Sequence, residues 1–448
     1  MDYQYDGGVL SRRQWMINSS ACLLAASQFG LAPVNDSKRP RVAAILTEFA
    51  FRSHAHVILE NFLEPYYFNG KLTDPGAEIV SLYVDQFPEG RDMARSVARQ
   101  YGIPIFDSIR DAMTLKTSRL AVDAILSIGE HGRYPRTSRG AVMYPRKRFF
   151  DEIVHEFRNS GSAVPVFNDK HLSYRQDWAD EMMAVARELK IPFMAGSSVP
   201  LAERRPPLEI ASGTKFTEAV SIHGGPPESY DFHAMEVLQS LVEGRAGGES
   251  GVRSIQMLEE DEVWKAAAAG RWDSRLAKAA LSNELGRQVD SLENFTEPRN
   301  GQKFPVHAIL IEYRDGFRAT ILSMGRDSTR WLFAARIADQ PDPVVTRFYV
   351  GPWENRNLFK ALSHAIQVHF RERTAPYPVE RTWLVTGMLE AALQSRFEKN
   401  RLVETPHLNI KYRARDFRRF REMGASWKVI TEDQPEPTGI NPGGPRPT

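Results

Sequence analysis

The chain gathers groups capable of acid–base chemistry in one short stretch, residues 168–171 (Asn-Asp-Lys-His). An apolar run at residues 163–167 precedes it and predicts a buried strand, and residues 177–189 carry a helical pattern. A strand, then charged groups, then a helix places Lys170 at the carboxyl end of a predicted parallel sheet. Open α/β sheets bind ligands at that edge, so we expect Lys170 to face a ligand. The alternative is an ion pair of Lys170 with Asp169 or Glu130 that only closes the loop.

Histidines form a second signal. Six of the eleven histidines fall in loops that the predicted fold brings to one edge of the sheet: His54, His56, His131, His171, His223 and His233. Carboxylates in the same loops could complete a divalent-metal site with them: Glu48, Glu130, Asp169 and Asp231. No spacing such as His-Glu-x-x-His is present, so a polar cleft lined with imidazoles is favoured and no metal ligand is assigned.

Length and composition describe a globular chain of two domains of ordinary size. It has 448 residues, of which 42% are hydrophobic and 25% are charged. The net charge of +2 gives no argument for nucleic acid as a partner. No apolar run reaches the roughly 18–20 residues of a membrane helix.

Residues 1–38 are expected to be an export signal and linker. Arg12-Arg13 precede a mildly apolar segment and a small-residue stop at residues 30–32, a pattern similar to a bacterial twin-arginine signal. The alternative is an exposed arginine pair before an amphipathic helix. The export reading predicts a periplasmic or exported protein. The only cysteine, Cys22, lies within the signal, so the exported protein would have no disulfide.

Two structural units are expected after the signal. Residues 39–200 alternate short apolar runs with helical patterns, which predicts a Rossmann-like, doubly wound parallel sheet. Residues 201–431 are expected to form an α+β domain with a mostly antiparallel open sheet, because its strand-like runs are joined by short turns such as residues 314–316. Residues 432–448 hold five prolines and three glycines and are expected to be disordered.

This organisation resembles the glucose–fructose oxidoreductase and inositol dehydrogenase family (Gfo/Idh/MocA). Asp169-Lys170-His171 is similar to the family's Glu-Lys-Pro, and Gly129-Glu130-His131 stands where the family has a loop after its fourth strand. Gly224-Gly225 and His233 resemble its Gly-Gly…Asp-x-x-x-His segment, with Ser229 in place of the aspartate and Asp231 close by. Residues 405–408 are placed like the family's closing segment.

The resemblance implies a nicotinamide cofactor, NAD or NADP, but one motif departs from it. The family has Gly-x-Gly-x-x-Gly after strand one, where a Cβ would obstruct the pyrophosphate. Here residues 47–56 contain no glycine. The positions that the resemblance assigns to cofactor binding are Thr47, Arg52, Ser53, Asp85, Glu130 and Asp169. Asp85 is equally a helix-capping candidate, and both alternatives for the cofactor stay open.

The resemblance further implies that Lys170 and His233, with Asp231, act as acid and base on a sugar hydroxyl. Histidine, nearer neutrality unaided, is the easier base, and Lys170 would polarise the oxygen. The substrate-binding candidates are His131, His171 and Tyr230. The favoured hypothesis is an exported oxidoreductase acting on a carbohydrate or polyol. The alternatives are a cofactor-free or metal-dependent sugar lyase or hydrolase, and a non-catalytic carbohydrate-binding protein. Pairing of two copies through the second sheet is a further expectation from the family.

Overall fold

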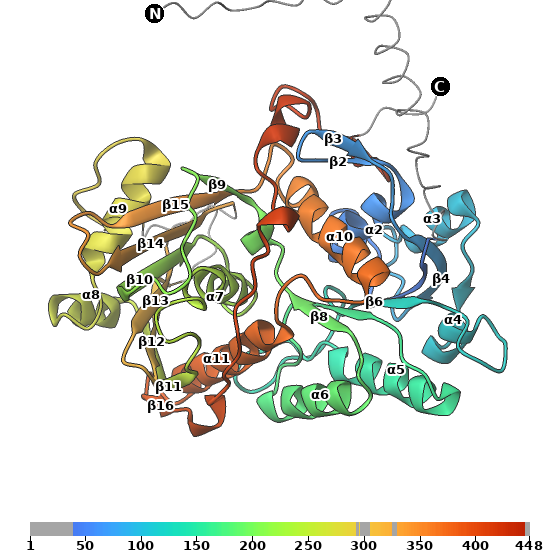
Figure 1. Cartoon of the computed structure of the whole chain (residues 1–448), viewed down its shortest axis with the longest axis horizontal. Helices are drawn as coiled ribbons and strands as arrows, with labels where there is room; N and C mark the ends of the chain where they lie inside the picture. Colours follow the sequence, from blue (N-terminus) through green and yellow to red (C-terminus); the bar gives the residue numbers. More distant parts are fainter. Residues whose placement is uncertain (1–38, 293–294, 296–304, 325–328, 444–448) are drawn as a thin grey trace, which may run out of the picture. The chain divides into compact units, whose positions relative to one another are not determined.

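A six-stranded parallel sheet forms the first half of the chain (Figure 1). The computed structural model describes residues 39–292, 295, 305–324 and 329–443, so the expected export signal lies outside the described residues. The strands, in spatial order, are β5 (Ile105–Phe106), β4 (Glu78–Val84), β1 (Arg41–Leu46), β6 (Ala124–Ile128), β7 (Val166–Asp169) and β8 (Phe193–Gly196). From β1 the chain first builds β4 and β5 on one side of that strand, and it then returns to build β6, β7 and β8 on the other side. This change of direction opens the crevice in which such sheets bind ligands.

Helices cover both faces of this sheet, as a doubly wound fold requires. They are α2 (His54–Leu63), α3 (Ala94–Tyr101), α4 (Ile109–Thr114), α5 (Arg146–Ser160) and α6 (Gln176–Glu188). Burial on both faces explains why β6 is buried at every residue and reads as one apolar run rather than an alternating one. A small hairpin, β2 (Tyr66–Phe68) with β3 (Lys71–Thr73), follows α2.

A second sheet of eight strands forms most of the later chain. In spatial order these are β16 (Val403–Glu404), β11 (Val252–Glu259), β12 (His307–Tyr313), β13 (Arg318–Ser323), β10 (Phe216–His223), β14 (Trp331–Ile337), β15 (Val344–Tyr349) and β9 (Glu203–Arg205). Every pair is antiparallel except β10 with β13, so the expected fold class is confirmed. β13 and β14 follow each other in the chain, but they do not pair, because β10 lies between them.

The second sheet has helices on both faces. On one face lie α7 (Ser229–Val242) and α11 (Val379–Phe397), and α11 also contacts α6 and β8 of the first half. On the other face lie α8 (Asp261–Ala268) and α9 (Ser274–Leu285). Leu276 of α9 and Trp272, which lies between the two helices, share an apolar cluster with Val220 and Leu322 of the sheet. The sequence did not predict α8 and α9, which cover part of the face through which pairing of two copies was expected.

Helix α10 (Asn355–Glu372) returns from the second half and packs against α2. Arg356 of α10 and Glu60 of α2 are both fully buried and lie 2.5 Å apart. Short 3₁₀ turns complete the structure at Val199–Leu201, Pro406–Leu408, Arg418–Phe420 and Ala425–Lys428. No helix within the described residues is long and apolar enough to cross a bilayer.

The expectation of a disordered tail was wrong for residues 432–443. Arg356 donates hydrogen bonds to the carbonyl oxygens of Gly439 and Asn441, both at 3.1 Å. Trp353 Nε1 donates to Gln434 O at 3.0 Å, and His56 Nε2 lies 2.9 Å from Gly439 O. Proline removes amide donors but not carbonyls, so this segment satisfies buried cationic donors that would otherwise lose their partners.

Truncation after Thr431 is therefore expected to destabilise the protein. Loss of these carbonyl acceptors leaves the buried Arg356 guanidinium short of partners, at a cost of roughly 3 kcal/mol in the free energy of unfolding. Urea denaturation followed by tryptophan fluorescence measures the difference. Asp433→Asn, which changes the tail's charge without touching Arg356, serves as the control and should stay within about 0.5 kcal/mol. Equal stability of the truncated and intact chains would contradict the packing.

Candidate functional site

A cleft of about 400 Å³ lies where the carboxyl edge of the parallel sheet meets α7, α10 and β14. Its polar lining residues are Arg52, His54, Glu130, His131, Lys170, Ser198, Ser229, Tyr230, His233, Thr329, Glu354 and Asn355. Its apolar lining residues are Val199, Trp331, Val350, Leu358 and Phe359. Ionisable groups beside aromatic and aliphatic side chains are the composition of a small-molecule site.

Glu130 organises the floor of the cleft. Its carboxylate lies 3.0 Å from Lys170 Nζ and 2.5 Å from Arg146 Nη2, and all three side chains are buried. Burial alone would raise the pKa of Glu130, but the charges of Lys170 and Arg146 outweigh it and hold the pKa well below its usual value. The ion pair that was the alternative explanation for Lys170 is therefore present, and it also presents Lys170 to the cleft.

Backbone strain accompanies this arrangement. Lys170 has a φ of 62° and His131 a φ of 70°, left-handed values that non-glycine residues rarely adopt. The amide of Lys170 donates to Gly196 O at 3.3 Å, which fixes the turn after β7. Each such conformation costs on the order of 1 kcal/mol, and strain of this kind concentrates at functional sites.

His54 and Asp169 form a buried dyad. Ser53 caps α2, which makes His54 the first residue of the helix, and Asp169 is the last residue of β7. His54 Nδ1 lies 2.6 Å from Asp169 Oδ2, and Asp169 is 1% exposed. A carboxylate that accepts a hydrogen bond from one ring nitrogen orients the imidazole and leaves the other ring nitrogen free to exchange a proton with a ligand, as in hydrolase triads. The dyad thus gives the cleft an oriented acid–base group.

His233 enters the cleft from α7. Its Nδ1 lies 2.6 Å from the hydroxyl of Ser197, which also accepts from the amide of Val199. Burial, together with the positive charge of Lys170, holds the pKa of His233 well below its usual value. His233 is therefore a neutral imidazole at physiological pH, able to accept or donate one hydrogen bond.

An aromatic wall faces these groups. The rings of Tyr230 and Trp331 stack with centroids 4.9 Å apart at an interplanar angle of 13°. His131, in the loop after β6, lies edge-on to His54, with ring centroids 5.1 Å apart. Burial and the neighbouring His54 lower the pKa of His131 to about 4, and its Nε2 has no hydrogen-bond partner among the described residues. Tyr230 and His131, expected to bind substrate, both line the cleft.

Two of the residues predicted to act on the substrate or bind it, Asp231 and His171, do not line the cleft. Asp231 is 1% exposed, and its Oδ1 accepts from His223 Nε2 at 2.9 Å and His307 Nε2 at 2.7 Å. Its Oδ2 accepts from the amide of Glu228, so it cannot serve as a catalytic group. His171 is 3% exposed, with Nδ1 2.7 Å from Ser173 O, and does not reach substrate either.

His223, Asp231 and His307 are the one set of potential metal ligands that the described part of the chain brings together. The chain itself satisfies these atoms: the Gly225 amide approaches His223 Nδ1, and the backbone of Pro305 bonds His307. Burial lowers the pKa of His307, but the adjacent Asp231 carboxylate outweighs it and raises the pKa above the usual value. An ion pair that joins α7 to β10 and β12 accounts for the geometry.

The residues expected to bind a dinucleotide are engaged elsewhere. Ser53 Oγ accepts from the amides of Ala50 and His56, and the amide of Arg52 donates to His56 Nδ1 at 2.9 Å. A pyrophosphate at the start of α2 would need such amides. The Arg52 guanidinium pairs with Glu436 at 2.9 Å and Glu354 at 3.2 Å.

Asp85, the residue expected to bind the ribose of the cofactor, is also bonded to other side chains of the protein. Asp85 accepts hydrogen bonds from the hydroxyls of Tyr83 at 2.8 Å and Tyr134 at 2.6 Å, and it pairs with Arg148. It caps no helix, since Met93 is the N-cap of α3. The hydroxyl of Thr47 donates to Glu130 O. The residues present therefore do not fit NAD or NADP, and no step is derived through either.

Sequence reasoning missed three contributors: His54 as partner of Asp169, Arg146 as partner of Glu130, and Trp331 in the aromatic wall. The pairing of His54 with Asp169 could have been predicted from the sequence. The loops after β1 and β7 meet at the same sheet edge, so a histidine in one and an aspartate in the other could have been paired. Nothing in the sequence pointed to Arg146 or Trp331, because each reaches the cleft only through tertiary packing.

Comparison with solved structures shows a shared fold. A myo-inositol dehydrogenase from Lactobacillus casei, in complex with NAD(H) and myo-inositol, is 11% identical, with a TM-score of 0.52, covering 82% of this chain and 96% of its own. GenD2 from gentamicin A biosynthesis, in complex with NAD, is 12% identical, with a TM-score of 0.51 and coverages of 82% and 96%. A myo-inositol 2-dehydrogenase from Lactobacillus plantarum is 13% identical, with a TM-score of 0.50 and coverages of 82% and 99%.

No family model matches the chain, and no curated protein matches its sequence. The chain thus shares its fold with these solved structures, inositol dehydrogenases among them, as the sequence resemblance implied. Identity at this level shows the fold alone, and function rests on the site.

The His307–Asp231 pair predicts a pH-dependent contribution to stability. A histidine whose folded pKa is raised above 6.5 contributes stability fully below pH 6.5, and this stability is lost as pH rises through the folded pKa. Relative to His307→Gln, the wild-type chain should gain most stability near pH 6 and progressively less towards pH 9. Urea denaturation across this range measures the difference. A stability gap that widened with rising pH would contradict the ion pair.

Proposed function

We propose that the protein is an acid–base enzyme, a lyase or hydrolase, that acts on a carbohydrate or polyol without a bound dinucleotide. One observation carries the proposal: the His54–Asp169 dyad and the Lys170–Glu130 pair face one cleft, while the dinucleotide positions are bonded within the chain. Stacked aromatic rings beside hydrogen-bonding groups suit the apolar face and the hydroxyls of a sugar ring.

The roles follow from the chemistry of each group. His54, oriented by Asp169, takes the proton from the ring carbon or the attacking water. Lys170, held by Glu130, places a positive charge beside the oxygen on which negative charge develops. His233, neutral because of burial, hydrogen-bonds a substrate hydroxyl, and the proton that His54 has taken passes to the leaving group as it departs.

A second candidate is hydride transfer with NAD or NADP on the same sugar. The shared fold with dehydrogenases, including complexes with NAD, favours it. In that reaction Lys170 and His233 would act on the hydroxyl that loses its proton. A non-catalytic sugar-binding protein is the third alternative, and it predicts sugar affinity that survives replacement of both residues.

Substitutions at the dyad and at Lys170 should remove turnover. Lys170→Met and His54→Gln are each expected to lower kcat by about 10²–10⁴-fold, because a positioned acid–base group contributes that much. The assay is a panel of glycosides and uronosides, followed by ultraviolet absorbance of unsaturated products and by release of reducing sugar. His155→Gln, an exposed histidine on α5, is the matched control. Turnover retained in both cleft variants would contradict these roles.

Cofactor binding separates the two candidate reactions. Calorimetric titration with NAD, NADH, NADP and NADPH should show no saturable binding, with or without sugar. Small molecules released from the purified protein should contain no nicotinamide by mass spectrometry. Stoichiometric binding of any of the four would overturn the cofactor-free proposal and leave the oxidoreductase. Turnover that survives a metal chelator would exclude the metal-dependent variant.

We further propose export through the twin-arginine-type segment at residues 1–38. Arg12→Lys with Arg13→Lys should hold the protein in the cytoplasm of a bacterial host, as measured by fractionation. Pairing of two copies remains a prediction for the part of the second sheet that α8 and α9 leave uncovered. Light scattering of the purified chain measures it.

A further inference from the structure

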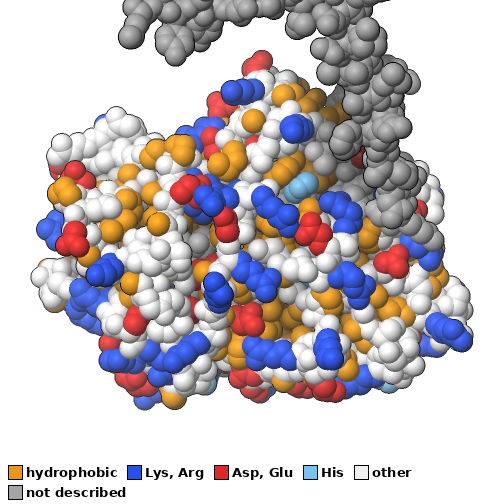
Figure 2. Space-filling model, viewed as in Figure 1, with side chains coloured by type: hydrophobic (Ala, Val, Ile, Leu, Met, Phe, Trp, Pro, Cys, Tyr) orange, Lys and Arg blue, Asp and Glu red, His pale blue; other side chains and the backbone are white. Residues whose placement is uncertain are grey.

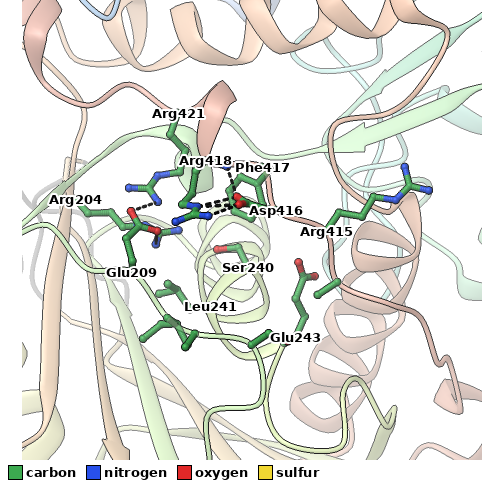
Figure 3. Close-up of a pocket in the computed structure, with 15 residues that line it drawn as sticks. Arg204, Glu209, Ser240, Leu241, Glu243, Arg415, Asp416, Phe417, Arg418 and Arg421 are labelled. Atoms are coloured by element: carbon green, nitrogen blue, oxygen red, sulfur yellow. Dashed lines mark hydrogen bonds and ion pairs between the residues drawn. The ribbon is translucent and has the colours of Figure 1, made fainter.

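A second cavity lies at the opposite end of α7 from the cleft (Figure 3). Its volume is about 450 Å³. Its walls come from β9, from the turn after β9, from the last residues of α7, and from residues 414–421. Ser240 and Leu241 of α7 line it, seven or more residues after Ser229, Tyr230 and His233, the residues of the same helix that reach the cleft. None of the groups described so far belongs to this cavity.

Two arginines are buried in its wall with incomplete partners. Arg204 is 5% exposed and Arg421 is 1% exposed, and the Nε atom of each has no hydrogen-bond partner among the described residues. They share one carboxylate: Glu209 lies 2.7 Å from Arg421 Nη1 and 3.8 Å from Arg204 Nη1. Glu209 is itself 41% exposed, so it neutralises the two buried charges poorly.

A third arginine stands beside them. Arg418 forms a bidentate pair with Asp416 and is 63% exposed (Figure 3). In the same view Ser240 points towards this group, whereas Arg415 points away. The remaining carboxylate, Glu243, is already paired with the buried Arg381. Three guanidinium groups therefore face two carboxylates, which leaves one positive charge without a counter-charge.

The electrostatics support an anionic ligand. Burial, and then the neighbouring charge of Arg421, lower the pKa of Arg204 to about 9. Burial and like-charge repulsion destabilise the charged form of Arg204, so an anion bound beside it would stabilise that form. The carboxyl end of α7 opposes an anion with roughly half a negative charge, less than the uncompensated positive charge. Figure 2 shows Lys and Arg side chains across the middle of this face of the molecule, with Asp and Glu side chains among them.

We infer that this cavity binds a small oxyanion, namely the phosphate, sulfate or carboxylate group of a small molecule. Guanidinium groups present paired donors that match the oxygens of such groups, and Arg418, which is 63% exposed, offers such donors beside Arg204 and Arg421 in the lining of the cavity. The cavity has room for more than the anion alone, so the oxyanion is carried by a larger body of sugar or organic-acid size. This inference does not depend on the reaction in the cleft.

Calorimetric titration of the full chain with inorganic phosphate tests it, at constant ionic strength set with chloride. Sulfate and glucuronate, titrated separately, identify which oxyanion is preferred. Saturable binding of one anion per chain is expected. Arg418→Gln should weaken it by at least about tenfold, the value of a charge-assisted bidentate contact. Glu209→Gln, which removes the competing carboxylate, should strengthen it several-fold.

Arg419→Gln is the matched control. Arg419 is 65% exposed and adjoins Arg418 in sequence, but it pairs with Glu372 outside the cavity. Thermal unfolding of each variant confirms that it is folded, which the exposure of Arg418 favours. Absence of saturable binding by all three anions would overturn the inference. Equal weakening in Arg418→Gln and Arg419→Gln, or binding untouched by Arg418→Gln and Glu209→Gln, would overturn it as well.

Discussion

The buried carboxylate of Glu130 is the constraint on which the cleft depends. It joins the loop after β6 to Arg146 at the start of α5 and to Lys170 after β7, so three segments of the sheet edge are fixed by one group. Removing one member of a buried charge cluster costs on the order of 3–5 kcal/mol, because the remaining charges lose their partners. That energy is enough to hold Lys170 and His131 in left-handed backbone conformations that the chain would otherwise avoid. Stability and the placement of the reactive groups therefore come from the same interaction.

The strand order is that of dinucleotide-binding sheets, but the loops at the ligand-binding edge differ from those that hold a dinucleotide. Where the family resemblance places a glycine-rich turn, Phe49 is fully buried and Ser53 and His56 satisfy the amides. Where a ribose would bind, Tyr134 and Arg148 hold Asp85. The tail and the start of α10 pair with Arg52. The sheet alone thus fixes where a ligand lies, and the loops decide which ligand it is.

Local patterns predicted the parts of the fold that local physics controls. Parallel strands such as β1 and β6 are buried on both faces and read as continuous apolar runs. The same information could not show that β10 inserts between β13 and β14, because pairing across distant segments leaves no periodic trace. In residues 432–443, by contrast, the local pattern predicted disorder and contacts with distant residues produced order. The proline and glycine content of this segment predicts disorder, but the order comes from Arg356 and Trp353, about eighty residues earlier in the chain. Lys170, His131, His233 and Tyr230, which the sequence singled out, line the cleft, whereas the sequence pointed to His54 without pairing it with Asp169.

Helix geometry explains why Asp231 and His233 have different tasks although the sequence suggested a common one. Two residues along an α-helix point about 200° apart, so both cannot face the same cleft. Asp231 faces the second sheet and binds His223 and His307, which sets the rotation of α7 at its first turn. Further along, Thr382 bonds Glu236 and Arg381 bonds Glu243, so α11 fixes the rest of the helix. With these anchors in place, His233 on the opposite side has one direction available, towards Ser197 and Lys170. The aspartate therefore serves the site through the position of the helix rather than through contact with a ligand.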